Sequence, residues 1–136
     1  MEIKAFDYLP CDAKDIRIEV FVEEQGFTQE FDEHDRTAVH LVGYIDDKST
    51  ATARIIGLEN GYLIGRIAVR KPYRKNGLGG RIIAAAEDII RRKGGKTVYI
   101  HAQQRAVAFY EKQGYFPTGE VDEEEGCVHW MMKKDL

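Results

Sequence analysis

The middle of the chain alternates between strand-like and helix-like patterns, and this order constrains the fold more than any other feature. Tyr62–Val69 and Thr97–His101 are short runs rich in β-branched and aromatic residues, as strands are. The residues between them that recur on one face of a helix are Leu78, Ile82, Ile83, Ala86, Ile89 and Ile90. Two strands joined through a helix normally pair in parallel. The sequence therefore predicts an α/β fold with a parallel pair of strands.

The segments on either side of this unit predict further strands and helices. The expected strands are Glu2–Phe6, Val39–Ile45, Ala51–Leu58, Tyr115–Val121 and Val128–Met132, and the other expected helices are Ala13–Val22 and Arg105–Gln113. Asp12 is the expected N-cap of the first helix. The full order is β-α-β-β-β-α-β-α-β-β, which gives a mixed sheet. A chain of 136 residues without a linker predicts one domain, residues 1–136.

Composition and charge exclude several classes of protein. The residues are 43% hydrophobic and 32% charged, and the formal net charge of −3 argues against a general nucleic-acid binder. The longest uncharged apolar stretch, Ala38–Ile45, is too short to cross a membrane. The first residues carry no export signal, so we expect a cytoplasmic protein. Cys11 and Cys127 lie far apart and match neither a zinc spacing nor a disulfide framework.

The helix that starts near Leu78 has a basic N-terminus, which the helix dipole disfavours. The basic residues of its approach and first turn are Arg70, Lys71, Arg74, Lys75 and Arg81, with glycines at positions 77, 79 and 80. Backbone N–H groups free of Cβ atoms let a phosphate come close, and flanking cations neutralise it. The pattern favours a bound anion, and a solvated basic loop is the plain alternative.

Two nucleotide-binding motifs do not fit this loop. A Walker A loop requires glycine five residues before Gly95-Lys96-Thr97, and Ile90 stands there. A dinucleotide fingerprint that starts at Gly77 requires glycine or alanine where Ile82 stands. The loop is therefore neither a P-loop nor a Rossmann motif.

Two stretches resemble the motifs of the GCN5-related N-acetyltransferase (GNAT) family. IAVRKPYRKNGLGGRII, residues 67–83, is similar to the acyl-CoA loop of that family, whose core stands here as residues 74–79. HAQQRAVAFYEKQGYFPTG, residues 101–119, resembles the second motif, a strand followed by a short helix. VFVEEQGF, DEHDRTAVHLV and EEEGCVHWMM are similar to the ElaA-like branch of the family. The likeness covers nearly the whole chain.

The resemblance implies the GNAT acyl-CoA N-acyltransferase fold, mostly antiparallel with splayed central parallel strands, and acetyl-CoA as the acyl donor. The residues expected at the cosubstrate are Ile67, Ala68, Val69, Arg74, Lys75, Asn76, Gly77, Leu78, Gly79, Gly80, Gln103 and Phe109. The loop would bind the pyrophosphate, and N–H groups near Ala68 and Val69 would form an oxyanion hole for the thioester. Gln103 departs from the family pattern, which often has asparagine at this place.

The resemblance also implies that Tyr110 protonates the departing CoA thiolate. The candidate bases for a primary amine acceptor, on a small molecule or a peptide, are Glu24, His34 and His129. The alternative for Tyr110 is that it is an aromatic residue of a helix packed on the sheet. The alternative for each candidate base is that it is a solvated charge or a packed imidazole ring. His101 is expected to be structural.

The remaining expectations concern metal, partners and competing functions. The acidic run Asp122–Glu125 is interpreted as a solvated hairpin tip, and Asp32–Asp35 lacks the spacing of an EF-hand, so no metal is expected. The acceptor and the oligomeric state stay open, with a homodimer as one option. A longer-chain acyltransferase related to the autoinducer synthases and a CoA-binding or interaction module without turnover are the alternative functions.

Overall fold

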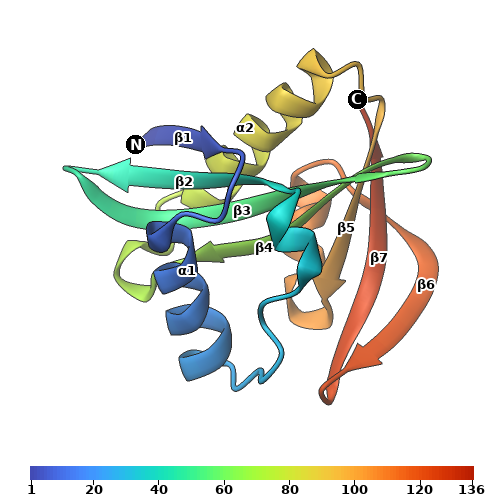
Figure 1. Ribbon diagram of the computed structural model, residues 1–136. Coiled ribbons are helices and arrows are strands. Elements are labelled where there is room, and N and C mark those ends of the chain that lie inside the picture. Colours follow the sequence, from blue (N-terminus) through green and yellow to red (C-terminus); the bar gives the residue numbers. More distant parts are fainter.

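One seven-stranded sheet runs through the computed structural model, which describes residues 1–136. Its strands are β1 (Glu2–Phe6), β2 (Val39–Ile45), β3 (Lys48–Leu58), β4 (Gly61–Val69), β5 (Thr97–Gln103), β6 (Phe116–Glu124) and β7 (Cys127–Asp135). They lie in the order β1-β2-β3-β4-β5-β7-β6, and every neighbouring pair except β4 and β5 is antiparallel (Figure 1). The predicted mixed sheet with one parallel pair is confirmed.

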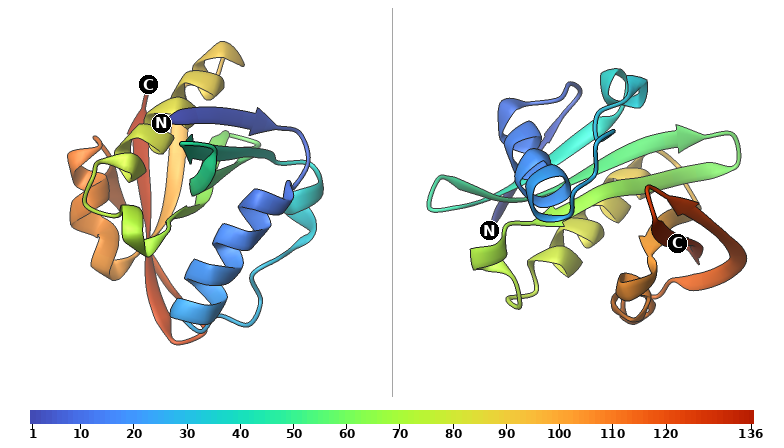
Figure 2. Two further views of the ribbon diagram at one scale, coloured as in Figure 1. Left: turned by 90° about the vertical axis from the view of Figure 1, so that its left-hand side faces the viewer. Right: turned by 90° about the horizontal axis from the view of Figure 1, so that it is seen from below.

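Helices cover both faces of this sheet, and each face has its own apolar core (Figure 2). On one face, α1 (Cys11–Arg17) packs over Val42. On the other face, α2 (Leu78–Arg92) and α3 (Val107–Lys112) close a larger cluster that includes Leu41. Leu41 and Val42 belong to different cores because successive strand residues point to opposite faces.

The first helix begins and ends differently from the sequence prediction. Its N-cap is Pro10, and Asp12, which was expected there, accepts a hydrogen bond of 2.6 Å from the Tyr44 hydroxyl. After α1 the chain continues directly into a π-helical segment, Ile18–Glu24. π-Helical turns next to α-helices are frequent at functional sites. Here the segment leads to Gln25, which lines a cavity beside β4 and β5.

The strands at the C-terminal end extend further than their sequence pattern predicts. β5 runs to Gln103 rather than to His101. The acidic run Asp122–Glu125, expected to form a hairpin tip, lies mostly within β6, and the turn is formed by Glu125 and Gly126. Pairing with β7 outweighs the weak strand propensity of acidic residues. These extensions place Gln103 of β5 and Asp122 of β6 opposite His129 of β7.

α2 follows the predicted charge pattern at both ends. Its N-cap, Gly77, has a left-handed φ of 76°, and no side chain caps the first turn. At its C-terminus, Arg91 and Arg92 lie in the last turn, and Gly94 has a φ of 82°.

Every helix is too short or too polar to traverse a lipid bilayer.

Candidate active site

β4 separates from β5 after a short parallel ladder, which joins Tyr62–Ile64 to Val98–Ile100. Just beyond it, β4 has a bulge against β3, where Arg66 and Ile67 face the single residue Ala53. Arg66 adopts a left-handed φ of 50°. A bulge bends its strand and increases the local twist. The backbone of β4 beyond the ladder therefore has no strand partner on its β5 side.

A cavity of about 220 Å³ lies beside this opening. Its apolar lining residues are Phe21, Phe27, Ile64, Ile67, Ile100, Ala106 and Tyr110. Its polar and charged lining residues include Gln25, Gln29, Glu30, Arg66, His101, Gln103, Arg105, Glu124, Glu125 and His129. Polar and charged residues outnumber apolar ones in this lining, so the cavity offers a bound small molecule several hydrogen-bond and charge partners beside an apolar wall.

Tyr110 lies on α3, is only 9% exposed and lines the cavity. Burial raises the pKa of its phenol to about 12, and no neighbouring group contributes to this change. The hydroxyl is therefore protonated at neutral pH and can donate a proton to a group bound in the cavity. Tyr110 also belongs to the larger apolar core, so its ring has a packing role as well.

Two histidines from neighbouring strands lie on the cavity wall, with their rings stacked and the ring centroids 4.6 Å apart. His129 Nδ1 donates to the Cys127 carbonyl oxygen at 3.0 Å, which leaves the lone pair of a neutral ring on Nε2. His101, expected to be structural, lines the cavity and donates from Nε2 to the Asp122 carboxylate at 2.8 Å. The third histidine considered, His34, is exposed and does not line the cavity.

Glu24 ends the π-helical segment and lies outside this cavity. Its two carboxylate oxygens accept hydrogen bonds of 2.7 Å from both terminal nitrogens of Arg74. This guanidinium lowers the pKa of the Glu24 carboxyl. Arg74 also donates from Nε to the Val69 carbonyl oxygen at 2.8 Å. Glu24, a predicted base, and Arg74, a predicted CoA ligand, thus form an ion pair. This pair connects the π-helical segment to the glycine loop.

The glycine loop presents an uncapped helix N-terminus. Lys75 and Gly77 adopt left-handed φ angles of 68° and 76°. A Cβ atom on Gly77 would meet nothing within 4 Å, so the backbone there is open to solvent. Lys75 and Asn76 are exposed beside it. This combination of free N–H groups, open space and positive charge is suited to a phosphate.

The following loop residues pack against the protein. Leu78 is 4% exposed. A Cβ atom on Gly79 would lie 3.1 Å from the Phe109 ring, and one on Gly80 would lie 3.2 Å from the Gln113 amide. These two glycines therefore allow α2 and α3 to approach closely, a role that their position in the motif did not indicate.

Gln103 lies at the edge of the cavity, where β5 ends. Its Nε2 donates to Gln25 Oε1 at 2.8 Å, and its Oε1 accepts from Arg105 Nε at 3.0 Å. The amide already links β5 to the segment after the π-helix. One N–H of this amide and one lone pair of its oxygen are not used in these bonds, so a pantetheine arm can contact Gln103 without displacing either of them.

Buried ion pairs hold the segment that follows the π-helical turn against α1, β3 and β4. Arg17 is 1% exposed and donates to Glu30 and Asp35, each at 2.8 Å. Arg54 adds a contact of 3.0 Å to Asp35, and Arg66 one of 3.0 Å to Glu30. Burial acts to raise the pKa of Asp35, but hydrogen bonds from Arg17 and Arg54 outweigh it and lower that pKa. Burial raises the pKa of Glu30.

Comparison with known proteins identifies the family. A family model described as acetyltransferase (GNAT) domain matches residues 11–136. The chain belongs to the GNAT acetyltransferase family. This match confirms the family predicted from the two motifs and makes the protein an acyltransferase.

Relatives and solved structures agree with this assignment. The uncharacterised N-acetyltransferase YjcF of Bacillus subtilis is 36% identical over 128 residues, 91% of this chain and 91% of YjcF. ElaA of Escherichia coli is 31% identical over 128 residues, 89% of this chain and 84% of ElaA. The crystal structure of ElaA has a TM-score of 0.87 over 98% of both chains, at 27% identity. These matches support the ElaA-like branch and confirm the predicted fold.

An aminoglycoside 6'-N-acetyltransferase complexed with coenzyme A shares the fold. Its TM-score is 0.73, at 18% identity, over 99% of this GNAT chain and 97% of the other.

The structure places two residues at the cavity that the sequence did not indicate there. His101 and Glu124 line it, whereas a structural role was expected for His101 and a solvated hairpin tip for Glu124. A signal for the buried charges was present, because Arg54 and Arg66 each interrupt an apolar strand. A charge in such a position is retained when it is paired.

Proposed function

We propose that this GNAT protein transfers the acetyl group of acetyl-CoA to a primary amine of a small molecule or peptide by direct attack. The observation that carries the proposal is the cavity beside the splayed strands, which is lined by β4 residues Ile64–Ile67, by Tyr110 and by His129. These supply the three functions that acyl transfer to an amine requires, which are a hydrogen-bond donor for an oxyanion, a proton donor and a proton acceptor.

The donor binds along the edge of α2 and β4 in this proposal. The pyrophosphate lies on the free N–H groups at Gly77, and Lys75 and Arg74 supply positive charge. The pantetheine arm pairs with the free side of β4 from Ile67 to Val69, so that backbone N–H groups reach the thioester oxygen. Coenzyme A in the complex of the aminoglycoside 6'-N-acetyltransferase, which shares this fold, supports a CoA donor.

The chemistry then uses two side chains of the cavity. The amine nitrogen attacks the thioester carbon, and His129 Nε2 accepts the proton that the amine loses. Backbone N–H groups of β4 stabilise the oxyanion, a contribution of about 3 kcal/mol for each donor in acyl transfer. When the carbon–sulfur bond breaks, Tyr110 gives its proton to the departing sulfur. The products are the acetylated amine and CoA thiol.

His129 is a better candidate base than Glu24 for two reasons. His129 is 6% exposed and lies on the cavity wall, whereas Glu24 lies outside it. The Arg74 guanidinium also lowers the pKa of Glu24, which makes its carboxylate a weaker base. We therefore assign Glu24 the role of holding Arg74, and with it the glycine loop, in position.

The proposal is tested by thiol release from acyl-CoA across a panel of amines. The panel contains polyamines, amino sugars, arylalkylamines and lysine peptides, each offered with acetyl-CoA and with octanoyl-CoA. We expect turnover of acetyl-CoA with at least one amine and slower turnover of octanoyl-CoA. A preference for octanoyl-CoA would favour the longer-chain acyltransferase. Tight CoA binding without thiol release for any amine would favour the module without turnover.

A further inference from the structure

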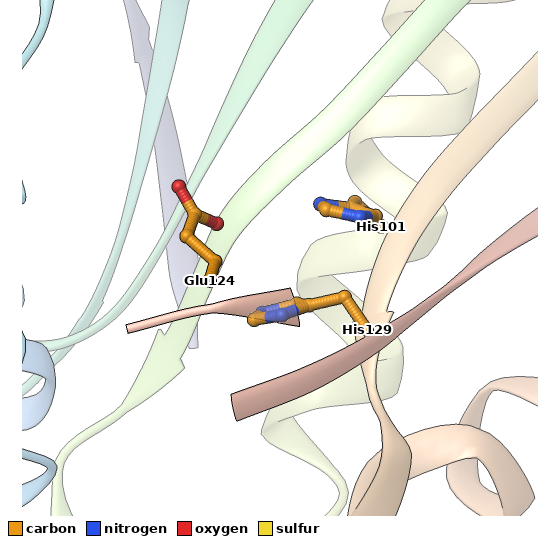
Figure 3. Close-up of side chains that lie close together, drawn as sticks. All are labelled: His101, Glu124 and His129. Carbon is orange, nitrogen blue, oxygen red and sulfur yellow. The ribbon is translucent and has the colours of Figure 1, made fainter. Parts of the chain in front are cut away.

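Three strands bring a set of polar side chains to one side of the sheet, beside the cavity. In the strand register, His129 lies opposite Gln103 on β5 and opposite Asp122 on β6. His101 is two residues from Gln103 on β5, and Glu124 is two residues from Asp122 on β6. Both side chains therefore lie on the same face of the sheet as His129. Figure 3 shows His101, His129 and Glu124 gathered around one space, with the two rings one above the other.

Each of the two histidines already has the hydrogen bond that a metal-binding histidine requires. Such a ligand donates its second ring N–H to a carboxylate or a backbone carbonyl, which fixes the tautomer and the ring. His101 donates to the Asp122 carboxylate, and His129 donates to the Cys127 carbonyl oxygen. Both rings therefore keep one nitrogen lone pair for another partner. Acetyl transfer needs at most one of these bases.

We propose that His101, His129 and Glu124 form a binding site for Zn²⁺. Ligand atoms of the three side chains lie within 4.8 Å of one another. Zinc–ligand bonds of about 2.0–2.1 Å require tetrahedral ligand atoms about 3.3 Å apart, so the largest separation must shrink by about 1.5 Å. Glu124 is exposed, so rotation of its side chain can bring the carboxylate closer to the two rings.

The chemistry of the ligands selects zinc over the abundant hard cations. Two imidazoles and one carboxylate suit Zn²⁺, whereas Mg²⁺ and Ca²⁺ prefer oxygen ligands throughout. Three protein ligands leave a fourth position open toward the cavity. A bound Zn²⁺ occupies the lone pair with which His129 would accept a proton, so the zinc-bound protein is inactive as an acetyltransferase. This last consequence rests on the proposed function, and zinc binding itself does not.

Calorimetric titration of chelator-treated protein with ZnCl₂ tests the binding. We expect one site with a Kd below about 1 μM, and no heat from MgCl₂ or CaCl₂. His101→Ala and His129→Ala should each weaken binding more than about 100-fold, and Asp122→Asn about 10- to 100-fold. The matched controls are His34→Ala, an exposed histidine, and Glu123→Gln, a neighbouring acid on the opposite face of β6. Binding that survives both histidine substitutions would overturn the proposal.

Crystals soaked in ZnCl₂ give a second test that needs no variant. An anomalous peak at the zinc edge should lie between His101, His129 and Glu124. A peak elsewhere on the chain, or none, would overturn the assignment even if a histidine variant failed to fold. Where an accepted amine is known, saturating Zn²⁺ should abolish turnover and a chelator should restore it, and unchanged turnover would refute the inhibition. Failure of every amine would leave the titration and the anomalous map unaffected.

Discussion

The ion pair of Glu24 and Arg74 decides what each of these residues can contribute. Both carboxylate oxygens and both terminal guanidinium nitrogens are engaged at 2.7 Å. A two-pronged contact of this kind is geometrically specific and is stronger than a single ion pair. Because both side chains are about one-third exposed, solvent screens the pair and an incoming phosphate can compete with Glu24 for Arg74.

Glu24→Gln separates the two roles considered for this residue. If Glu24 only holds Arg74, losing its charge frees the guanidinium for the pyrophosphate, and the Kd for CoA should fall about three- to tenfold. Turnover should remain within about threefold of the parent value. A drop in kcat of about 10²-fold with an accepted amine would instead assign Glu24 as the base. Calorimetry with CoA and a thiol-release assay measure the two quantities.

Gly77 offers a test of the phosphate site in which stability and binding move in opposite directions. Asp and Asn both tolerate a left-handed φ, and each can cap the free N–H groups of α2. Gly77→Asp should therefore keep or raise the Tm, while its charge weakens CoA binding at least about tenfold. Gly77→Asn is the neutral control and should weaken binding much less. Equal CoA affinity in the two variants would show that the pyrophosphate does not bind at this loop.

Among the elements, the segment after the π-helix depends most on charges that are buried. Residues 27–36 contain little regular structure, yet Glu30 and Asp35 are each only 6% exposed. Arg17, Arg54 and Arg66 bind them from α1 and from two strands. This network holds the side of the cavity that carries Phe27, Gln29 and Glu30. Its loss is therefore expected to affect both stability and the acceptor site.

Arg17→Met should lower the free energy of unfolding by about 3–5 kcal/mol, because it leaves buried carboxylates with fewer cations. Denaturant titration measures the change. Arg91→Met is the matched control, since Arg91 forms an exposed pair with Asp88 and should change stability by less than about 0.5 kcal/mol. Equal effects in the two variants would show that the buried network adds no more than a surface pair.

Acid should weaken the same network through Asp35. Its folded pKa lies below the usual value of about 4, so its stabilisation is fully present above pH 4 and is lost as the pH falls below it. Glu30, whose pKa is raised, acts in the opposite direction. The difference in unfolding free energy between the parent and Asp35→Asn should therefore shrink between pH 5 and pH 2. A constant difference over this range would contradict the low pKa of Asp35.

The element order could be predicted because it depends on local patterns, such as the apolar face of α2 and the strand at Tyr62–Val69. Element ends were predicted less well, since β6 is held by its pairing with β7 rather than by its own acidic sequence. The buried Arg17 and the cluster of His101 with Glu124 could not be found locally. Each depends on residues brought together by strand register or by contacts between distant segments.

For the whole molecule, the single parallel pair explains why the functional groups meet where they do. β4 and β5 pair over only three residues on each strand and then separate, and the cavity lies beside the separation. α2 begins on one side of this opening with free N–H groups, and α3 places Tyr110 beside it. The hairpin of β6 and β7 supplies His129. The central claim is that these parts together carry out acetyl transfer.

Tyr110→Phe tests that claim most directly, since it keeps the packed ring and removes only the hydroxyl. With an accepted amine, kcat should fall about 10²-fold, while the Kd for acetyl-CoA and the Tm stay near their parent values. The expected split follows because the hydroxyl acts only as the carbon–sulfur bond breaks. Parent-level kcat in Tyr110→Phe, with binding and folding intact, would contradict the account.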